Sequence, residues 1–73
     1  MHTVIITGWE AGFLKVSHST LLREAAAMSL SEAKAATDSV VEGTPVSISM
    51  ATEAEAESLV MRLRQLKAVA QVA

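Results

Sequence analysis

The sequence predicts an α+β domain, a two-layer sandwich in which three helices pack on a small three-stranded sheet in the order β-α-α-β-α-β. Three observations predict this class. The chain opens with a β-branched run, two helical patterns then meet at a strong helix-start signal, and an alternating strand pattern precedes a third helical pattern. Internal repeats and low-complexity segments are absent from the sequence, so residues 1–73 are interpreted as a single module.

Composition limits both the core and the partners of this chain. Its 73 residues are 51 % hydrophobic, include one Trp, one Phe and no Cys, and carry a net charge of −2. The core must therefore be aliphatic and cannot rely on disulfides. The slightly acidic balance argues against nucleic acid or an anionic membrane as the main partner. Because no apolar run approaches the roughly 20 residues of a membrane span and no signal-peptide pattern is present, we expect a cytoplasmic protein.

The first strand and helix are read from residue type and spacing. The run Thr3–Thr7 is β-branched throughout and predicts a strand that ends at Gly8. A loop with two glycines is expected over Gly8–Gly12. A helix is expected from about Lys15 or Ser17 to Ala27, since its apolar residues share one stripe. That stripe consists of Leu21, Leu22 and Ala25.

A sharp corner between two helices is predicted at Ser29. Its hydroxyl is placed to cap a new helix, and Glu32, three residues later, can return a hydrogen bond to the Ser29 N–H. The second helix is expected over Leu30–Val41, and Gly43 supplies the left-handed residue that often ends a helix. Its buried stripe is predicted to be Ala33, Thr37, Val40 and Val41.

The last part of the chain predicts a strand, a helix and a strand. Apolar and hydroxyl side chains alternate over Pro45–Met50, as in a strand with one buried face. Thr52 and Glu55 predict a second capping box at the start of the third helix. A short strand over Val69–Val72 can close the sheet. The third helix has its apolar stripe at Ala56, Leu59, Val60, Leu63 and Leu66.

Catalysis is the least favoured class of function. Ser17 and Ser19 flank His18, but neighbours along a helix point in different directions, so a structural role is expected for this imidazole. Two isolated histidines without cysteine give no metal-site spacing, and the glycines are too sparse for a dinucleotide loop. We therefore expect no enzyme, no metal and no cofactor.

Two features remain as candidates for binding a partner. Trp9 is either an exposed anchor or, like Phe13, a ring folded over the open end of the core. The cations Lys15, Arg23 and Lys34 lie on the first two predicted helices. They are either solvated surface charges or a small basic patch for an acidic protein surface.

Two segments carry a resemblance to a known family. Leu22-Arg23, followed by Leu30-Ser31-Glu32-Ala33-Lys34, resembles "V-R … G-L-G-L-K-E-A-K" in the C-terminal domain of the bacterial ribosomal stalk protein (L-seven/L-twelve). Ala56-Glu57 with Leu59, followed by Ala70-Gln71-Val72, resembles that domain's "A-E-A-L … A-E-V-E-V" ending. The resemblance covers nearly the whole chain and implies the same order of strands and helices.

The resemblance implies a free-standing protein-binding module. In the family, the first two helices recruit translational GTPases through basic and aliphatic residues. Ser19, Thr20 and Ser31 stand where the family has isoleucine, lysine and lysine, which makes this surface less basic and less apolar. Trp9 is a further candidate as an exposed anchor, so the expected partner-binding residues are Lys15, Val16, Arg23, Leu30, Lys34 and Trp9.

Three alternatives stay open. The adaptor of the Clp protease, ClpS, shares the stalk-domain architecture, although Gly8-Trp9-Glu10 stands where its Asn-Asp pair is expected. The apolar excess could instead be buried in a homodimer with a structural role. A small-ligand pocket near Trp9 is the third.

Overall fold

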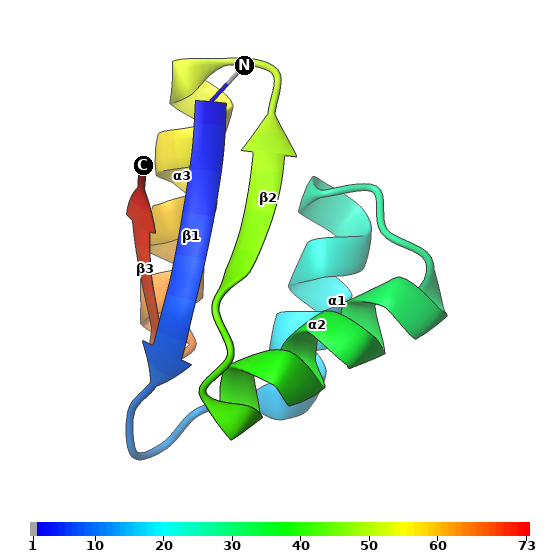
Figure 1. Ribbon diagram of the computed structural model, residues 1–73. Coiled ribbons are helices and arrows are strands. Elements are labelled where there is room, and N and C mark those ends of the chain that lie inside the picture. The colour runs from blue at the N-terminus through cyan, green and yellow to red at the C-terminus, as the bar shows by residue number, and fades with distance from the viewer. Residues whose placement is uncertain (1) are drawn as a thin grey trace.

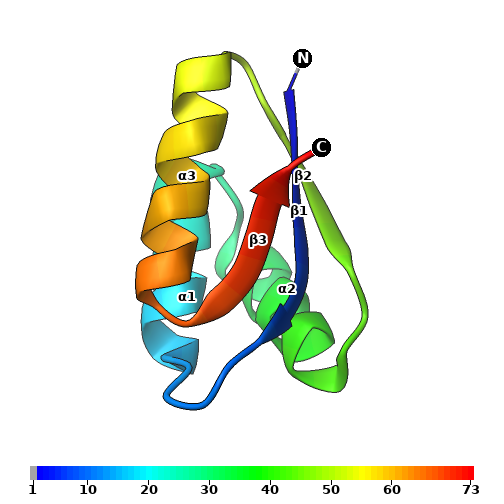
Figure 2. The same cartoon turned by 90° about the vertical axis from the view of Figure 1, so that its left-hand side faces the viewer.

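The structure, a computed structural model, describes residues 2–73 and confirms the predicted α+β class. Its elements are β1 (His2–Trp9), α1 (Lys15–Ala25), α2 (Leu30–Glu42), β2 (Val46–Met50), α3 (Glu53–Gln65) and β3 (Ala68–Val72) (Figure 1). The strands form one antiparallel sheet with β1 in the centre, in the order β2-β1-β3. Helix α3 runs along the sheet beside β3, whereas α1 and α2 pack on each other towards β2 (Figures 1 and 2).

Strand β1 is longer than its β-branched run predicts. Val4 and Ile6 are fully buried beneath the helices, while Ile5 points to the uncovered face. After an irregularity in the register beyond Ile6, Gly8 and Trp9 still pair with β3. The predicted loop over Gly8–Gly12 is therefore wrong for its first two residues. Pairing with a neighbouring strand outweighs the weak strand preference of glycine.

The corner between α1 and α2 confirms its predicted cap. The Glu32 N–H donates to Ser29 Oγ at 3.1 Å, and the Ser29 N–H donates to Glu32 Oε1 at 3.0 Å. Gly43 has a φ of 87° and ends α2 in the left-handed conformation, as expected. Helix α1 ends at Ala25, two residues before the predicted Ala27. Ala27 has a φ of 53°, which a right-handed helix cannot contain.

Helix α3 also follows its sequence signals, with one correction. Thr52 Oγ1 accepts the Glu55 N–H at 3.1 Å, but within residues 2–73 the reciprocal bond is not made, so this capping box is only half formed. Acidic residues occupy the first turn and Arg62 and Arg64 the last, which suits the helix dipole. Lys67, at a φ of 69°, turns the chain back into β3.

The core lies between the sheet and the three helices. The sheet contributes alternate residues from each strand, and the helices contribute the predicted stripes. Ala25, Val41 and Leu66, expected on those stripes, are only partly buried. Buried apolar side chains come from Val4, Ile6, Leu21, Leu22, Ala33, Val40, Ile48, Met50, Ala56, Leu59, Val60, Leu63, Ala68 and Ala70.

Candidate protein-interaction face

A shallow hollow of about 330 Å³ lies between α1 and α2. Three of the residues expected to bind a partner line it: Lys15, Val16 and Lys34. The complete lining consists of Lys15, Val16, Ser19, Lys34, Thr37 and Asp38. The structure thus brings together side chains that are about twenty positions apart in the sequence.

Helical spacing connects the other two predicted helix residues to this hollow. Lys15, Ser19 and Arg23 follow at intervals of four, so Arg23 continues the same stripe of α1 one turn further on. Leu30 lies four residues before Lys34 on α2 and is 49 % exposed. We refer to the surface formed by Lys15, Val16, Arg23, Leu30 and Lys34 as the α1–α2 face.

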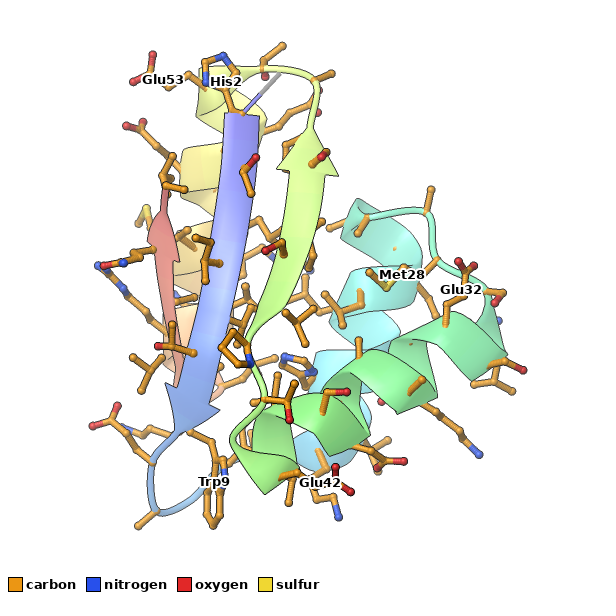
Figure 3. The ribbon with its side chains drawn as sticks, viewed as in Figure 1. His2, Trp9, Met28, Glu32, Glu42 and Glu53 are labelled. Carbon is orange, nitrogen blue, oxygen red and sulfur yellow. The ribbon has the colours of Figure 1, made fainter. Side chains whose placement is uncertain are left out.

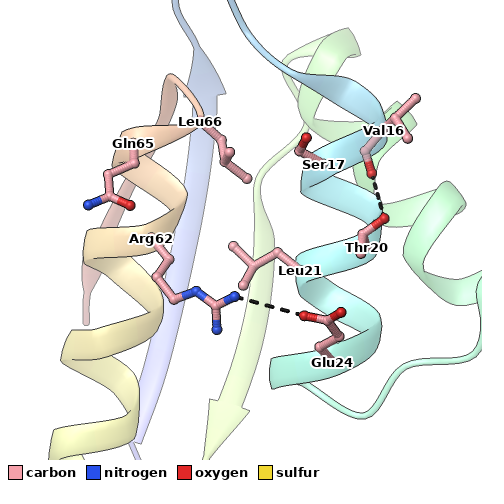
Figure 4. Close-up of a pocket in the computed structure, with 8 residues that line it drawn as sticks. All are labelled: Val16, Ser17, Thr20, Leu21, Glu24, Arg62, Gln65 and Leu66. Atoms are coloured by element: carbon pink, nitrogen blue, oxygen red, sulfur yellow. Dashed lines mark hydrogen bonds and ion pairs between the residues drawn. The ribbon is translucent and has the colours of Figure 1, made fainter.

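Val16 is the most exposed large apolar side chain of this face, at 82 %. It also borders a second hollow, of about 310 Å³, on the other side of α1. Figure 4 shows this second hollow between α1 and α3, where Arg62 Nη2 lies 3.9 Å from Glu24 Oε2. Val16 therefore lies between the two hollows and lines both of them. An apolar side chain in that position is accessible to a partner from either side.

Within residues 2–73, the cations of the α1–α2 face have no ion-pair partner. In this part of the chain, Arg62 and Glu24 form the single ion pair that is present. Asp38 lines the hollow with Lys15 and Lys34, but its carboxylate makes no ion pair with either of them in this part of the chain. The positive charges are therefore available to a carboxylate on another molecule.

Beneath the hollow, three polar side chains join α1 to α2. Thr37 Oγ1 donates to the Ala33 carbonyl at 2.9 Å, which uses its single proton. The same oxygen lies 2.9 Å from Ser19 Oγ and 2.8 Å from His18 Nδ1. Thr37 must therefore accept from both groups, so Ser19 donates its hydroxyl proton and His18 carries its proton on Nδ1.

His18 is fully buried, and the network leaves its second nitrogen without a partner. The ring packs edge-on against Phe13, with centroids 5.1 Å apart. Nε2 is an unprotonated acceptor in these apolar surroundings, and burial lowers the pKa of His18 to about 4. The imidazole is neutral at pH 7. The structure therefore places a fully buried, neutral imidazole between α1 and α2.

Trp9 lies apart from the α1–α2 hollow. Its indole N–H donates to the Val41 carbonyl at 3.0 Å, and the side chain is 48 % exposed. Figure 3 shows Trp9 near Glu42, at the end of α2 opposite to Glu32. Phe13 instead packs against the core, as expected for a ring that covers its open end. The structure does not bring Trp9 together with the five residues of the α1–α2 face.

Sequence reasoning missed part of the hollow. Asp38 carried no signal beyond its place on α2, one position after Thr37. Thr37 was expected on the buried stripe, but its partners were not. His18 lies three and four residues before Leu21 and Leu22, so helical spacing puts it on the buried stripe of α1. That spacing was the signal that the imidazole would be buried.

No protein-family model matches the chain, and no curated protein matches it. Within residues 2–73, no three His, Asp or Glu side chains gather as a metal ion would require. The helices of this same part of the chain are all too short or too polar to cross a membrane.

Proposed function

We propose that this protein is a binding module that takes a protein partner on its α1–α2 face. The observation that carries the proposal is the hollow between α1 and α2, where two lysines, neither with an ion pair to any residue in 2–73, lie near hydroxyl groups and the exposed Val16. Such a surface combines charge, which steers and orients a partner, with apolar area, which holds it. The nearby imidazole of His18 is buried and does not form part of this surface.

The chemistry of the face defines the partner. Three cations favour an acidic surface, and the exposed Val16 and Leu30 favour an apolar side chain among its carboxylates. The resemblance to the ribosomal stalk domain nominates a translational GTPase as the first partner to test. A cytoplasmic location belongs to the same proposal.

The test is direct binding of purified translational GTPases to the wild-type protein and to the double variant Arg23→Glu/Lys34→Glu. We expect the wild type to bind with an affinity that falls as salt is added, because exposed charges are screened. The double variant reverses two of the three cations and should lose binding while its circular dichroism spectrum stays unchanged. Both side chains are exposed, so folding should not depend on them.

A control is Arg62→Glu, which reverses one cation on α3, outside the α1–α2 face, and so makes half the charge change of the double variant. Val16→Ser tests the apolar part of the face without altering charge. If Arg62→Glu weakens binding as strongly as the double variant, net charge and not this face governs the interaction. Binding that is equal for the wild type and all variants would refute the proposal.

A further inference from the structure

A third surface hollow, also of about 330 Å³, lies on the side of the molecule away from the α1–α2 face, between α3 and the outer strand β3. Figure 2 shows α3 and β3 side by side, facing the viewer. Met61 stands in this region with 64 % of its surface exposed, although its neighbour Val60 is buried. The lining consists of Glu57, Val60, Met61, Arg64 and Val72.

Opposite charges flank the exposed methionine. Glu57 comes four residues before Met61 and Arg64 three residues after it, so all three lie on one side of α3. A helix stripe with an acid at one end, an apolar centre and a base at the other is complementary to itself. When two copies are related by a two-fold axis near Met61, each Glu57 faces the Arg64 of the other copy.

The orientation of Arg64 is already fixed within the chain. Its Nε–H donates to the Ala70 carbonyl of β3 at 3.1 Å. A guanidinium group has five N–H donors, so the two terminal nitrogens stay free for a carboxylate. Because Arg64 occupies a carbonyl of this outer strand, it also discourages another strand from pairing there. A second copy is therefore more favourably bound against α3 than paired with β3.

We propose that two copies of this chain dimerise through antiparallel contact of their α3 helices. Met61 of each copy enters the hollow between α3 and β3 of the other, and Arg64 binds the partner's Glu57. Methionine suits this contact because its flexible thioether adapts to an irregular cavity. The α1–α2 face lies elsewhere and stays exposed, so the dimer presents that face twice. Dimerisation and partner binding are thus independent.

Sedimentation equilibrium at increasing protein concentration tests the proposal on the wild type, Glu57→Arg and Arg64→Glu. The wild type should approach the mass of two chains. Each single variant places like charges opposite each other at both ends of the contact, and its dimer dissociation constant should rise about tenfold or more. An equal mixture of the two variants should dimerise again, because the opposite charges then meet.

Two further variants control for folding and for position. Arg62→Glu makes the same change on the side of α3 that faces α1, and should dimerise like the wild type. Met61→Asp changes an exposed side chain, so it should fold normally yet stay monomeric. If Arg64→Glu fails to fold without its bond to Ala70, Glu57→Arg and Met61→Asp decide the question. The mass of one chain at every wild-type concentration, or a mixture that stays monomeric, would overturn the proposal.

Discussion

The helical layer is built in two different ways. Under α3 the packing is purely aliphatic, with Leu59 and Leu63 almost completely buried. Between α1 and α2 the contact also contains the buried polar pair His18 and Thr37, together with the part-buried Ser19. A domain of 73 residues thus uses dispersion and hydrophobic burial on one side and directional hydrogen bonds on the other.

The two kinds of packing control different properties of the domain. Aliphatic packing is non-directional, so α3 contributes stability in proportion to the apolar area that it buries. Hydrogen bonds among His18, Thr37 and Ser19 require particular distances and protonation states, so they fix how α1 sits on α2. The hollow of the α1–α2 face lies directly over these bonds. Its shape therefore depends on them.

The largest effect is expected from Leu63→Ala, which empties part of the aliphatic region. Truncation of a fully buried leucine costs about 2–5 kcal/mol, as transfer and cavity contributions add. A chain of 73 residues has a total stability of about 4–11 kcal/mol at roughly 0.05–0.15 kcal/mol per residue. Urea unfolding should show a variant close to the limit of folding, whereas Ser58→Ala, at an exposed site of the same helix, should change little.

The next effect separates the two regions by pH. His18 has a pKa of about 4 in the folded protein, against 6.5 in the unfolded chain, so the unfolded state binds more protons between these values. Stability should be constant above pH 6.5, fall as the pH drops towards 4, and be lower by about 3 kcal/mol at the end of that range. Urea unfolding at a series of pH values measures this.

The control for this pH dependence is His18→Leu, which removes the titrating group and leaves Thr37 bonded to Ala33 and Ser19. Its stability should be flat between pH 6.5 and about 4.5. Below that range a second loss begins, because hydrogen bonds from Ser29 lower the pKa of Glu32 and acid then disrupts the cap. An unchanged slope in His18→Leu would contradict the assignment to His18.

The sequence predicted most of the fold because its strongest signals are local. The α3 stripe, the Ser29 cap and the Gly43 stop each depend on residues within a few positions of one another. The error at Gly8 and Trp9 arose because distant residues decide the outcome there. Gly8 and Trp9 extend β1 only because β3 pairs with them, and no local signal near Gly8 reports that pairing.

The sequence indicated the exposed helix residues of the candidate site but not the buried hydrogen bonds beneath them. Lys15, Val16 and Lys34 followed from the resemblance to the stalk domain, and the structure places them around one hollow. The bond between His18 and Thr37 joins residues 19 positions apart, so neither residue could indicate its partner. The anchor of the Trp9 indole on Val41, 32 positions away, was hidden for the same reason.

Thr37→Val tests the polar contact without creating a cavity. Valine has nearly the same shape but cannot accept, so the buried His18 Nδ1–H would lose its partner. An unsatisfied buried donor costs about 1–3 kcal/mol. Urea unfolding should show this loss at pH 7. Ser19→Ala, which removes only the part-buried hydroxyl, should cost less. Equal losses would mean that the imidazole does not depend on Thr37.

The smallest effects come from the caps, which compare the two regions once more. Ser29 starts α2 with both bonds of a capping box, whereas Thr52 starts α3 with one. Ser29→Ala should therefore cost about 1 kcal/mol and Thr52→Ala about 0.5 kcal/mol, both measured by urea unfolding at pH 7.

Ser29→Ala should also weaken binding at the α1–α2 face, because Leu30 and Lys34 lie in the first two turns of α2. Thr52→Ala should leave that binding unchanged. If both variants lose equal stability and equal binding, the corner at Ser29 has no special part in shaping the face.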